Sequence, residues 1–289
     1  MMKLEYTFKN DTLFKMLFVK YPDLLKRLVS ELLGITFESI GQFVITNPEM
    51  PPESIGDKFC RLDINMTVDG QRVDLEIQVA DEGDYPERSL FYWARDYSMS
   101  LVSGEEYSKL PRTVIISIID FKLFDCTEFH SEFMPLEVTR HTPLTDRMSL
   151  HYFELPKLPV TVDVDNGLEL WLALFNAETE EELKQIEALE VPIMEEAIGA
   201  YRSITATDEF KEIERLRTLA RHNEASALGH ARREATAKAN AKWQAVVADK
   251  DAEWGSIVAN KDAALANKEA ALANKDAEIA RLRAQLGRD

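Results

Sequence analysis

The sequence has only two cysteines among 289 residues, and it has no long uncharged apolar run. Two thiols are too few for a disulfide framework or a four-thiolate zinc site. A membrane-spanning helix needs about 18 or more consecutive apolar residues. The first residues, 1–11, lack the basic and then apolar order of a secretion signal. We therefore expect a cytoplasmic protein with no membrane association.

Positive charge is also scarce, because 34 lysines and arginines face 51 aspartates and glutamates, giving a net charge of -17. Contacts with phosphate usually come from clustered basic side chains. A DNA-acting protein of this composition therefore needs a local patch, a bound metal ion or an oligomeric surface. Neither a GxGxxG motif after a strand nor a GxxxxGK[ST] motif is present, so we expect no nucleotide cofactor.

Hydrophobic residues make up 45% of the chain, enough for a sizeable core. Apolar residues recur at helical spacing over 8–33, and Pro22 divides this stretch into two helices. Alternating and β-branched runs within 40–80 and 111–121 predict strands. The segment of about 86–103 between them predicts a helix that starts at Pro86 and ends at Gly104. This order indicates an α/β fold with a mixed sheet flanked by helices.

The C-terminal half has a different pattern. Residues 163–235 show helical periodicity, and from about 208 the pattern fits one long helix through Trp243. A seven-residue repeat rich in Ala, Lys and acidic residues then occupies 259–286, with an earlier copy at 248–254. These changes predict three parts: a domain over 1–158, a helical region over 159–247 and a heptad-repeat helical tail over 248–289.

The heptad repeat has a thin apolar seam. One strong apolar residue recurs in each repeat, at Leu265, Leu272, Ile279 and Leu286, and charged residues occupy the positions that would complete the seam. Two interpretations remain open: a weak coiled coil that forms a homo-oligomer with help from the upstream helix, or an extended single helix. The four-residue offset of the earlier copy fits a stutter.

Residues 62–79 contain a hairpin signal, because Asp69-Gly70 suits a two-residue turn with positive φ at both positions. This turn pairs Met66 with Val73, Ile64 with Leu75 and Leu62 with Ile77 on one face. The other face then carries the pairs Asp63 with Glu76 and Asn65 with Asp74. A shift by one residue would set apolar residues against polar ones, so the pattern itself selects this register.

The register places the Asp63 and Glu76 carboxylates directly opposite each other, with β-carbons about 5 Å apart. Two like charges at this separation repel, and a divalent cation such as Mg²⁺ would offset the repulsion. Gln78 lies on the same face. The alternative interpretation is an ordinary solvated hairpin face.

A wider set of motifs resembles the PD-(D/E)XK nuclease superfamily, and more closely its Rpn group of recombination-promoting nucleases and transposases. The resemblance covers roughly residues 6–121. It rests on NDTLFKMLF at 10–18, Asp63 in RLDINM, VDLEIQV at 73–79, the segment 87–110 and the strand TVIISIIDF. It implies a restriction-endonuclease-like core with a mixed sheet, followed by an all-helical C-terminal region and the heptad-repeat tail.

The resemblance also implies roles for individual residues. Asp63 and Glu76 would bind the catalytic Mg²⁺, for which Mn²⁺ can substitute, with the Ile77 carbonyl as a further ligand. Gln78 stands where many superfamily members have lysine. Asp11 would be an additional carboxylate near the metal. Lys15 could supply positive charge there, although a simple Asp11–Lys15 helical ion pair is the alternative.

The activity implied by the resemblance is metal-dependent hydrolysis of DNA by an endonuclease, in support of recombination or of mobile elements. A homo-oligomer formed through the C-terminal helices would let two active sites cut both strands. The alternative is a slow or degenerate nuclease fold that acts as an oligomeric DNA- or protein-binding regulatory module.

Other residues admit functional and structural interpretations. Arg88, Tyr92 and Arg95 share a helix face that could meet a DNA backbone or could serve packing and ion pairs. We expect Phe91 and Trp93 in the core. The histidines show no paired metal-binding spacing, so we expect structural or surface roles for them. We expect Cys60 and Cys126 to be buried thiols.

Overall fold

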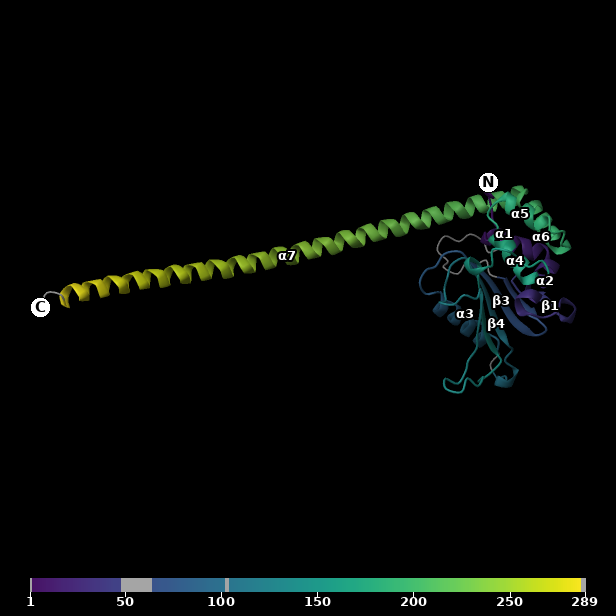
Figure 1. The fold of residues 1–289 in the computed structure, drawn as a ribbon, viewed down its shortest axis with the longest axis horizontal. Helices are drawn as coiled ribbons and strands as arrows, with labels where there is room; N and C mark the ends of the chain where they lie inside the picture. The colour runs from purple at the N-terminus through teal and green to yellow at the C-terminus, as the bar shows by residue number, and fades with distance from the viewer. Residues whose placement is uncertain (1, 48–63, 102–103, 287–289) are drawn as a thin grey trace. The chain divides into compact units, whose positions relative to one another are not determined.

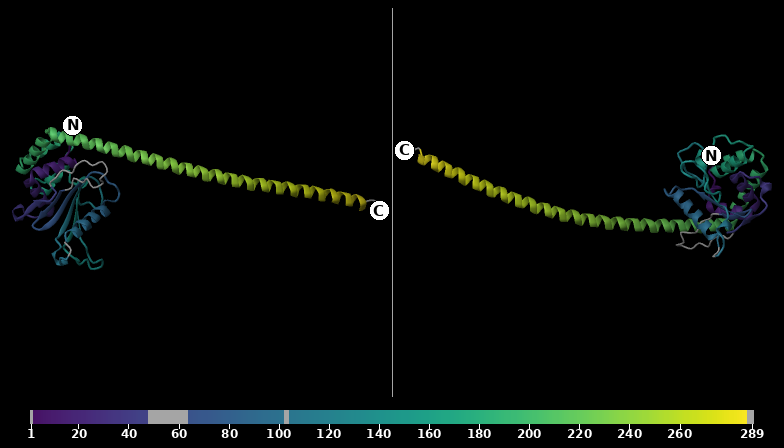
Figure 2. Two further views of the ribbon diagram at one scale, coloured as in Figure 1. Left: turned by 180° about the vertical axis from the view of Figure 1, so that it is seen from behind. Right: turned by 90° about the horizontal axis from the view of Figure 1, so that it is seen from below.

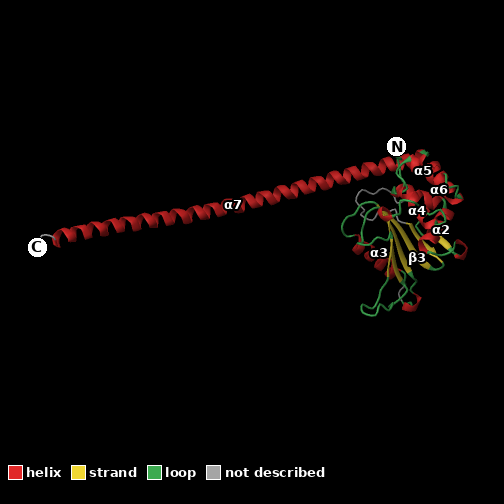
Figure 3. Cartoon of the chain, in the orientation of Figure 1, coloured by secondary structure: helices red, strands yellow, loops and turns green. Residues whose placement is uncertain are grey.

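A computed structural model describes residues 2–47, 64–101 and 104–286, with side chains described as far as residue 283 (Figures 1 and 3). The α-helices are α1 (Asp11–Lys20), α2 (Pro22–Leu33), α3 (Tyr85–Met99), α4 (Gly167–Asn176), α5 (Glu180–Glu187), α6 (Pro192–Thr205) and α7 (Asp208–Leu286). The strands are β1 (Phe43–Ile45), β2 (Ile64–Val68), β3 (Gln71–Gln78), β4 (Thr113–Ile119), β5 (His130–Phe133) and β6 (Met148–Glu154).

The six strands form one mixed sheet in the order β1-β2-β3-β4-β6-β5. The pairs β1–β2, β2–β3 and β5–β6 are antiparallel. The central strand β4 runs parallel to β3 on one side and to β6 on the other. The structure therefore confirms the expected α/β fold with a mixed sheet and flanking helices.

The hairpin between β2 and β3 has the predicted turn and the predicted register. Asp69 and Gly70 both have positive φ, 47° and 79°. Ile64 pairs with Leu75, Asn65 with Asp74 and Met66 with Val73. The other two predicted pairs, Leu62 with Ile77 and Asp63 with Glu76, each include a residue outside the described part of the chain. The apolar pattern was thus sufficient to set the strand register over the residues that can be compared.

The sheet has a main core on one face and a smaller core on the other. Helices α1, α2, α4, α5 and α6 contribute to the same hydrophobic cluster as the apolar face of the β2–β3 hairpin. Helix α3 packs on the opposite face, where its Tyr85 joins residues of β4 and β6 in a second cluster. Figures 1 and 2 show α3 apart from the other helices, across the sheet. The two faces of β3 therefore meet different environments.

Two strands and one helix boundary differ from the sequence prediction. Strands β5 and β6 were not predicted, although β6 pairs with β4 inside the sheet. The β6 sequence MSLHYFE mixes polar and apolar residues on both faces, so its period is weak. Helix α3 ends at Met99 rather than near Gly104. Phe91 was expected in the core but is 60% exposed, because α3 contacts the sheet through a different face.

The long helix predicted from about residue 208 is confirmed, and it continues through the heptad repeat to Leu286. The chain divides by internal contacts into one unit of Met1–Ala220 and a second of Arg221–Asp289. The predicted boundaries at 158 and 247 stay predictions. Within the described ranges, no helix is long and apolar enough to cross a membrane.

A chain of polar side chains joins the edge strand β5 to β6. Ser149 donates to the Glu132 carboxylate at 2.8 Å, so its oxygen accepts from His151 Nε2 at 2.9 Å. His151 Nδ1 is then an acceptor, and His130 Nε2 donates to it at 3.1 Å. The His151 imidazole, with an accepting Nδ1, is therefore neutral in the folded chain. Burial lowers the pKa of His151 to about 4 and also lowers the pKa of His130, while Glu132 opposes both shifts.

We predict that this pair makes the fold less stable in mild acid. The folded pKa of His151 is about 4, whereas an unfolded histidine titrates near about 6.5. Between these two values the unfolded chain binds more protons, so stability decreases as the pH falls through this window. The loss should be on the order of 2 kcal/mol for His151. Thermal unfolding between pH 7 and pH 4.5 measures it.

The variant His151→Gln should show a smaller decrease in melting temperature across the same pH range. The exposed residue His222 on α7 provides a matched control, and His222→Gln should behave like the unmodified chain. An unchanged pH dependence in His151→Gln would show that this histidine is not responsible.

Candidate active site

Two acidic residues of β3 are buried beneath α3. Asp74 is 7% exposed and Glu76 is 6% exposed. Both lie on the face of the sheet opposite the main core, next to Ile115 and Ser117 of β4 in the parallel register. The alternative of an ordinary solvated hairpin face is therefore wrong for these two residues. A buried carboxylate is costly unless charged or hydrogen-bonding groups compensate it.

Helix α3 is fixed over this face by contacts at both ends of its length. Pro86 in the first turn suits a helix start. Further along, the indole nitrogen of Trp93 donates to the Thr113 carbonyl at 3.0 Å. Asp96 forms a two-point ion pair with Arg72 of β3. Trp93 was expected in the core and is half-buried, packed on the second core.

Glu76 has a guanidinium and two phenols nearby. Arg88 Nη2 lies 3.9 Å from Glu76 Oε1, and the same guanidinium pairs with Glu82. Burial raises the pKa of Tyr85 well above its usual value, and the Glu76 charge adds to this, while the neighbouring Ser117 and the charge of Arg88 oppose it. Burial and the Glu76 charge likewise raise the pKa of Tyr152, which a hydrogen bond to Ser89 opposes. Both phenols therefore stay protonated near neutral pH.

Arg88 thus has a role that its helix-face spacing did not reveal. The sequence alone groups it with Tyr92 and Arg95 on a face that could meet a DNA backbone. Its side chain is 15% exposed and lies between Glu76 and Glu82. Arg95 is exposed and its guanidinium lies 5.8 Å from the Tyr92 ring centre. The signal that could have identified Arg88 is its place one helical turn after Tyr85, at the α3 end that faces β3.

Gln78 follows Glu76 on the same face of β3. Its side-chain nitrogen donates to the carbonyl of Ala80 at 2.7 Å. The main-chain carbonyl of Gln78 accepts from Asp120, just after β4, at 2.9 Å. This amide therefore lies at the C-terminal end of β3 and reaches the chain just beyond it.

Asp11 and Lys15 both lie on α1, one helical turn apart. Asp11 is in the first turn, where Arg217 of α7 approaches its carboxylate at 3.3 Å. Lys15 is buried, and its ammonium donates to the main-chain oxygen of Asn47 at 2.6 Å. The Asn47 side chain in turn accepts from the amide of Asn65 in β2 at 2.8 Å. Lys15 is therefore connected to the start of the strand that follows Asp63.

The remaining predicted ligand, Asp63, lies outside the described residues, as does Cys60. The described ranges alone contain no group of three or more His, Cys, Asp or Glu side chains that could hold a metal ion. Glu76 offers carboxylate oxygens, and Asp63 and the Ile77 carbonyl would offer further oxygens. Oxygen donors are the ligands that Mg²⁺ prefers. The donor chemistry therefore fits the ion that the sequence predicts.

A second cluster of charges near the end of β3 was not predicted. Lys9 is buried, and its ammonium pairs with Asp120 at 2.7 Å and with Glu178 at 3.1 Å. Asp120 is the residue whose amide binds the Gln78 carbonyl. These partners are far apart in the sequence, so no local spacing could have brought them together.

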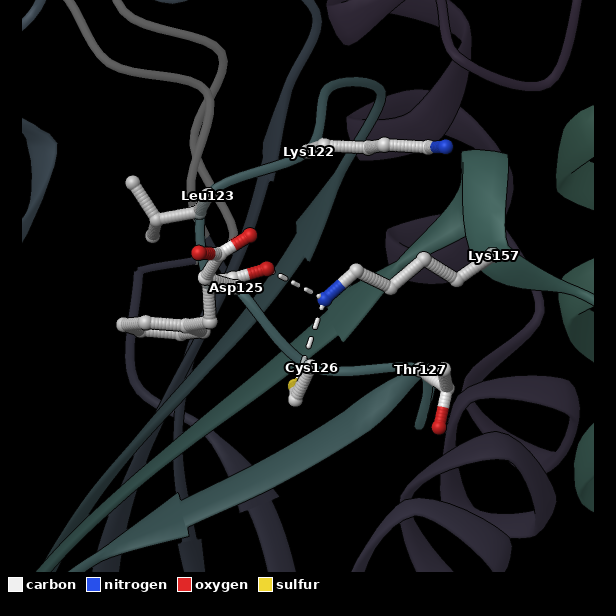
Figure 4. A pocket seen from close by; sticks show the side chains of 7 residues that line it. Lys122, Leu123, Asp125, Cys126, Thr127 and Lys157 are labelled. Atoms are coloured by element: carbon white, nitrogen blue, oxygen red, sulfur yellow. Dashed lines mark hydrogen bonds between the residues drawn. The ribbon is translucent and has the colours of Figure 1, made fainter.

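An open pocket of about 550 Å³ is lined by the loop 122–127 and Lys157 (Figure 4). Lys157 donates to Glu154 at 2.6 Å, to the Phe124 carbonyl at 2.8 Å and to the Cys126 sulfur at 3.3 Å. Cys126 is exposed, so the expectation of a buried thiol was wrong: the residue lies in a loop rather than in a strand. Of the predicted catalytic residues, those that the structure describes do not line this pocket.

Comparisons with known proteins place the chain in a family. Searches of curated proteins and of solved structures gave no significant match. A sequence model of the family described as PD-(D/E)XK nuclease family transposase matches residues 8–231, which include the β2–β3 hairpin, α3 and the start of α7. Because this match covers most of the chain, the protein belongs to the PD-(D/E)XK nuclease family of transposases.

Proposed function

We propose that the protein is a metal-dependent endonuclease that hydrolyses phosphodiester bonds of DNA, with its active site at the α3-covered face of the β2–β3 hairpin. The family supports a nuclease function. The observation that carries the proposal is the burial of Glu76 on this face beside Arg88. A carboxylate taken out of water in this way is costly, and a bound cation would offset the cost.

Asp63 and Glu76 would hold the metal ion, with the Ile77 carbonyl as a third donor. When bound, Mg²⁺ or Mn²⁺ would polarise a phosphoryl oxygen and lower the pKa of an attacking water. Arg88 would orient Glu76, since its guanidinium lies 3.9 Å from that carboxylate. The protonated Tyr85 and Tyr152 would exclude water from the buried side of Glu76 without adding negative charge.

The positive charge that lysine provides in many members of the superfamily would come from Lys15. Its buried ammonium is linked through Asn47 to Asn65 of β2, the strand that follows Asp63 in the sequence. Gln78 would position substrate or water by hydrogen bonds and contribute no charge. Asp11 would be an additional carboxylate near the metal ion, and its ion pair with Arg217 would hold its orientation.

The wider setting of this activity is also a proposal. DNA would be the substrate, cut during recombination or transposition. The chains would form a homo-oligomer through their C-terminal helices, so that two sites act on a duplex. We place the protein in a bacterial-type cytoplasm, since a free, exposed Cys126 suits a reducing compartment.

A second candidate is a slow or degenerate nuclease that serves as a binding module. The side-chain amide of Gln78 donates to the main-chain carbonyl of Ala80. This contact supports the second candidate, because an amide that bonds to the main chain is less able to act on a substrate. The net charge of -17 also supports the binding module, because a strongly negative chain is repelled by DNA.

The substitutions Asp63→Asn and Glu76→Gln should each lower DNA cleavage by about a hundredfold or more, because each removes a carboxylate that would hold the metal. Nicking and linearisation of a plasmid at low salt with Mg²⁺, Mn²⁺ or Ca²⁺ measures the effect. A single-stranded RNA of similar length, tested in parallel, separates the two classes of substrate.

The control for this experiment is Glu38→Gln, which neutralises an exposed glutamate outside the hairpin, in the short turn before β1. It should leave cleavage unchanged. Full cleavage by Glu76→Gln would contradict the proposal. Binding of DNA without cleavage by every variant and by the unmodified chain would favour the binding module.

The substitution Gln78→Lys should retain cleavage or increase it several-fold, because it restores a positive charge two residues after Glu76, where it can stabilise the developing phosphorane. Substituting Gln78→Met removes the amide at similar length and should decrease the rate. The initial rate of nicking at saturating Mg²⁺ measures both. A loss of activity in Gln78→Lys would mean that this site requires a neutral amide.

A further inference from the structure

The second unit of the chain presents a row of exposed apolar side chains along α7. In the described part of 221–289, apolar residues that would be buried in most proteins face solvent. Trp254 is 62% exposed and Leu272 is 66% exposed. A helix with a long exposed apolar row is stabilised mainly by packing against another surface.

These residues form one continuous heptad seam. Counting by sevens from Val258 gives Leu265, Leu272 and Ile279 at positions a, and counting from Val247 gives Trp254 and Leu282 at positions d. The repeat copies are offset by four residues, but this stutter does not interrupt the seam. The apolar residues before and after the offset keep the same a and d positions. The seam also contains charges, which are Asp251 at a and Lys261, Lys268 and Lys275 at d.

The charges in the seam discriminate between two orientations of paired helices. In a parallel pair, each d residue packs against the same d residue of the other chain. Lys261, Lys268 and Lys275 would then each face their own copy, which creates three successive layers of like charge. In an antiparallel pair, each a residue packs instead against a d residue of the other chain, and no lysine faces another.

One antiparallel register matches the charges as well as the apolar residues. It pairs Val247 with Ile279, Trp254 with Leu272, Val258 with Lys268, Leu265 with Lys261 and Asp251 with Lys275, each between the two chains. The apolar stems of the lysines pack on the valine and leucine while their ammonium groups reach solvent. The acid of the seam thus meets a base, and each end of the overlap has apolar pairs.

The residues that flank the seam agree with this register. At the g edge it places Lys250 beside Glu278 of the other chain, which is an oppositely charged pair. It also places Ala271 beside Ile257 and Ala264 beside its own copy, so small side chains allow close approach. At the e edge, Glu269 and Asp276 meet Gly255 and Ala248, and only Asp262 faces its own copy. A shift of one heptad in one direction sets Leu282 against Asp251. A shift in the other direction keeps Asp251 opposite a lysine, Lys268, but sets Ile279 against Asn240 and Lys250 against Ala271, so the proposed register is the best matched of the three.

We propose that residues 244–282 of α7 bind the same segment of a second copy of this chain as an antiparallel coiled coil, with Asp251 of each chain paired with Lys275 of the other. This inference rests on the proposed association of chains and adds its orientation and register. The two nuclease units then enter the paired segment from opposite ends, because each precedes this segment in its own chain.

Disulfide formation tests the register in the full chain with Cys60→Ser and Cys126→Ser as background. Ala264→Cys should link two chains under mild oxidation, because this position lies next to its own copy at the two-fold axis. Ala271→Cys, at the same heptad position one repeat later, is the matched control and should not self-link. Mixed with an Ile257→Cys chain, however, it should form a heterodimer.

Self-linking by Ala271→Cys would overturn the register, and self-linking by Leu272→Cys would indicate a parallel pair. Charge exchange provides an independent measurement by sedimentation equilibrium. Asp251→Lys should weaken association about tenfold or more, and Asp251→Lys combined with Lys275→Asp should restore it to within a few-fold.

A monomeric unmodified chain at tens of micromolar would contradict the association itself, whereas association without this rescue would contradict only the proposed pairing. Neither result would depend on nuclease activity, so failure here and failure of the proposed enzyme function are distinguishable.

Discussion

The burial of Glu76 is the constraint on which the candidate active site depends. A charged carboxylate that is 6% exposed must be compensated by nearby groups or by a bound cation. Arg88 supplies partial compensation from α3, at 3.9 Å. The same helix carries Tyr85, whose raised pKa keeps it neutral beside the carboxylate. The position of α3 across the sheet thus determines both the exposure and the electrostatics of the site.

The central sheet and its hairpin could be predicted because their signals are local. Asp69-Gly70 requires positive φ at both residues, and the structure has it. The alternation of apolar residues then sets the register. Strand β6 could not be predicted in this way: β4 and β5 pair along its two edges and both of its faces are buried, so polar residues such as Ser149 and His151 lie inside and no clear apolar period remains.

The candidate site could be predicted in part. Glu76 and Gln78 were identified from a short motif on one strand, and their shared face follows from the period of a strand. The roles of Arg88 and Lys9 depend on elements that meet only in the folded chain, at separations such as that between Lys9 and Asp120. Phe91 and Cys126 were expected to be buried and are exposed, so an apolar residue type alone does not predict burial.

The acidic composition and the nuclease family are consistent if the negative charge serves two separate purposes. In the first unit, carboxylates of β3 lie inward, where a cation can neutralise them. Along α7, an aspartate and three lysines interrupt an apolar seam, where they can select the orientation of a partner helix. The formal charge of the chain therefore does not describe the charge that DNA would meet at the active site.

The central claim is that Glu76 helps to hold a divalent metal ion, and metal-dependent thermal stability tests it most directly. Saturating Mg²⁺ or Mn²⁺ should raise the melting temperature of the unmodified chain, because the ion binds only the folded state. The same addition should have little effect on Glu76→Gln or Asp63→Ala. An equal increase in melting temperature in all three proteins would contradict the account.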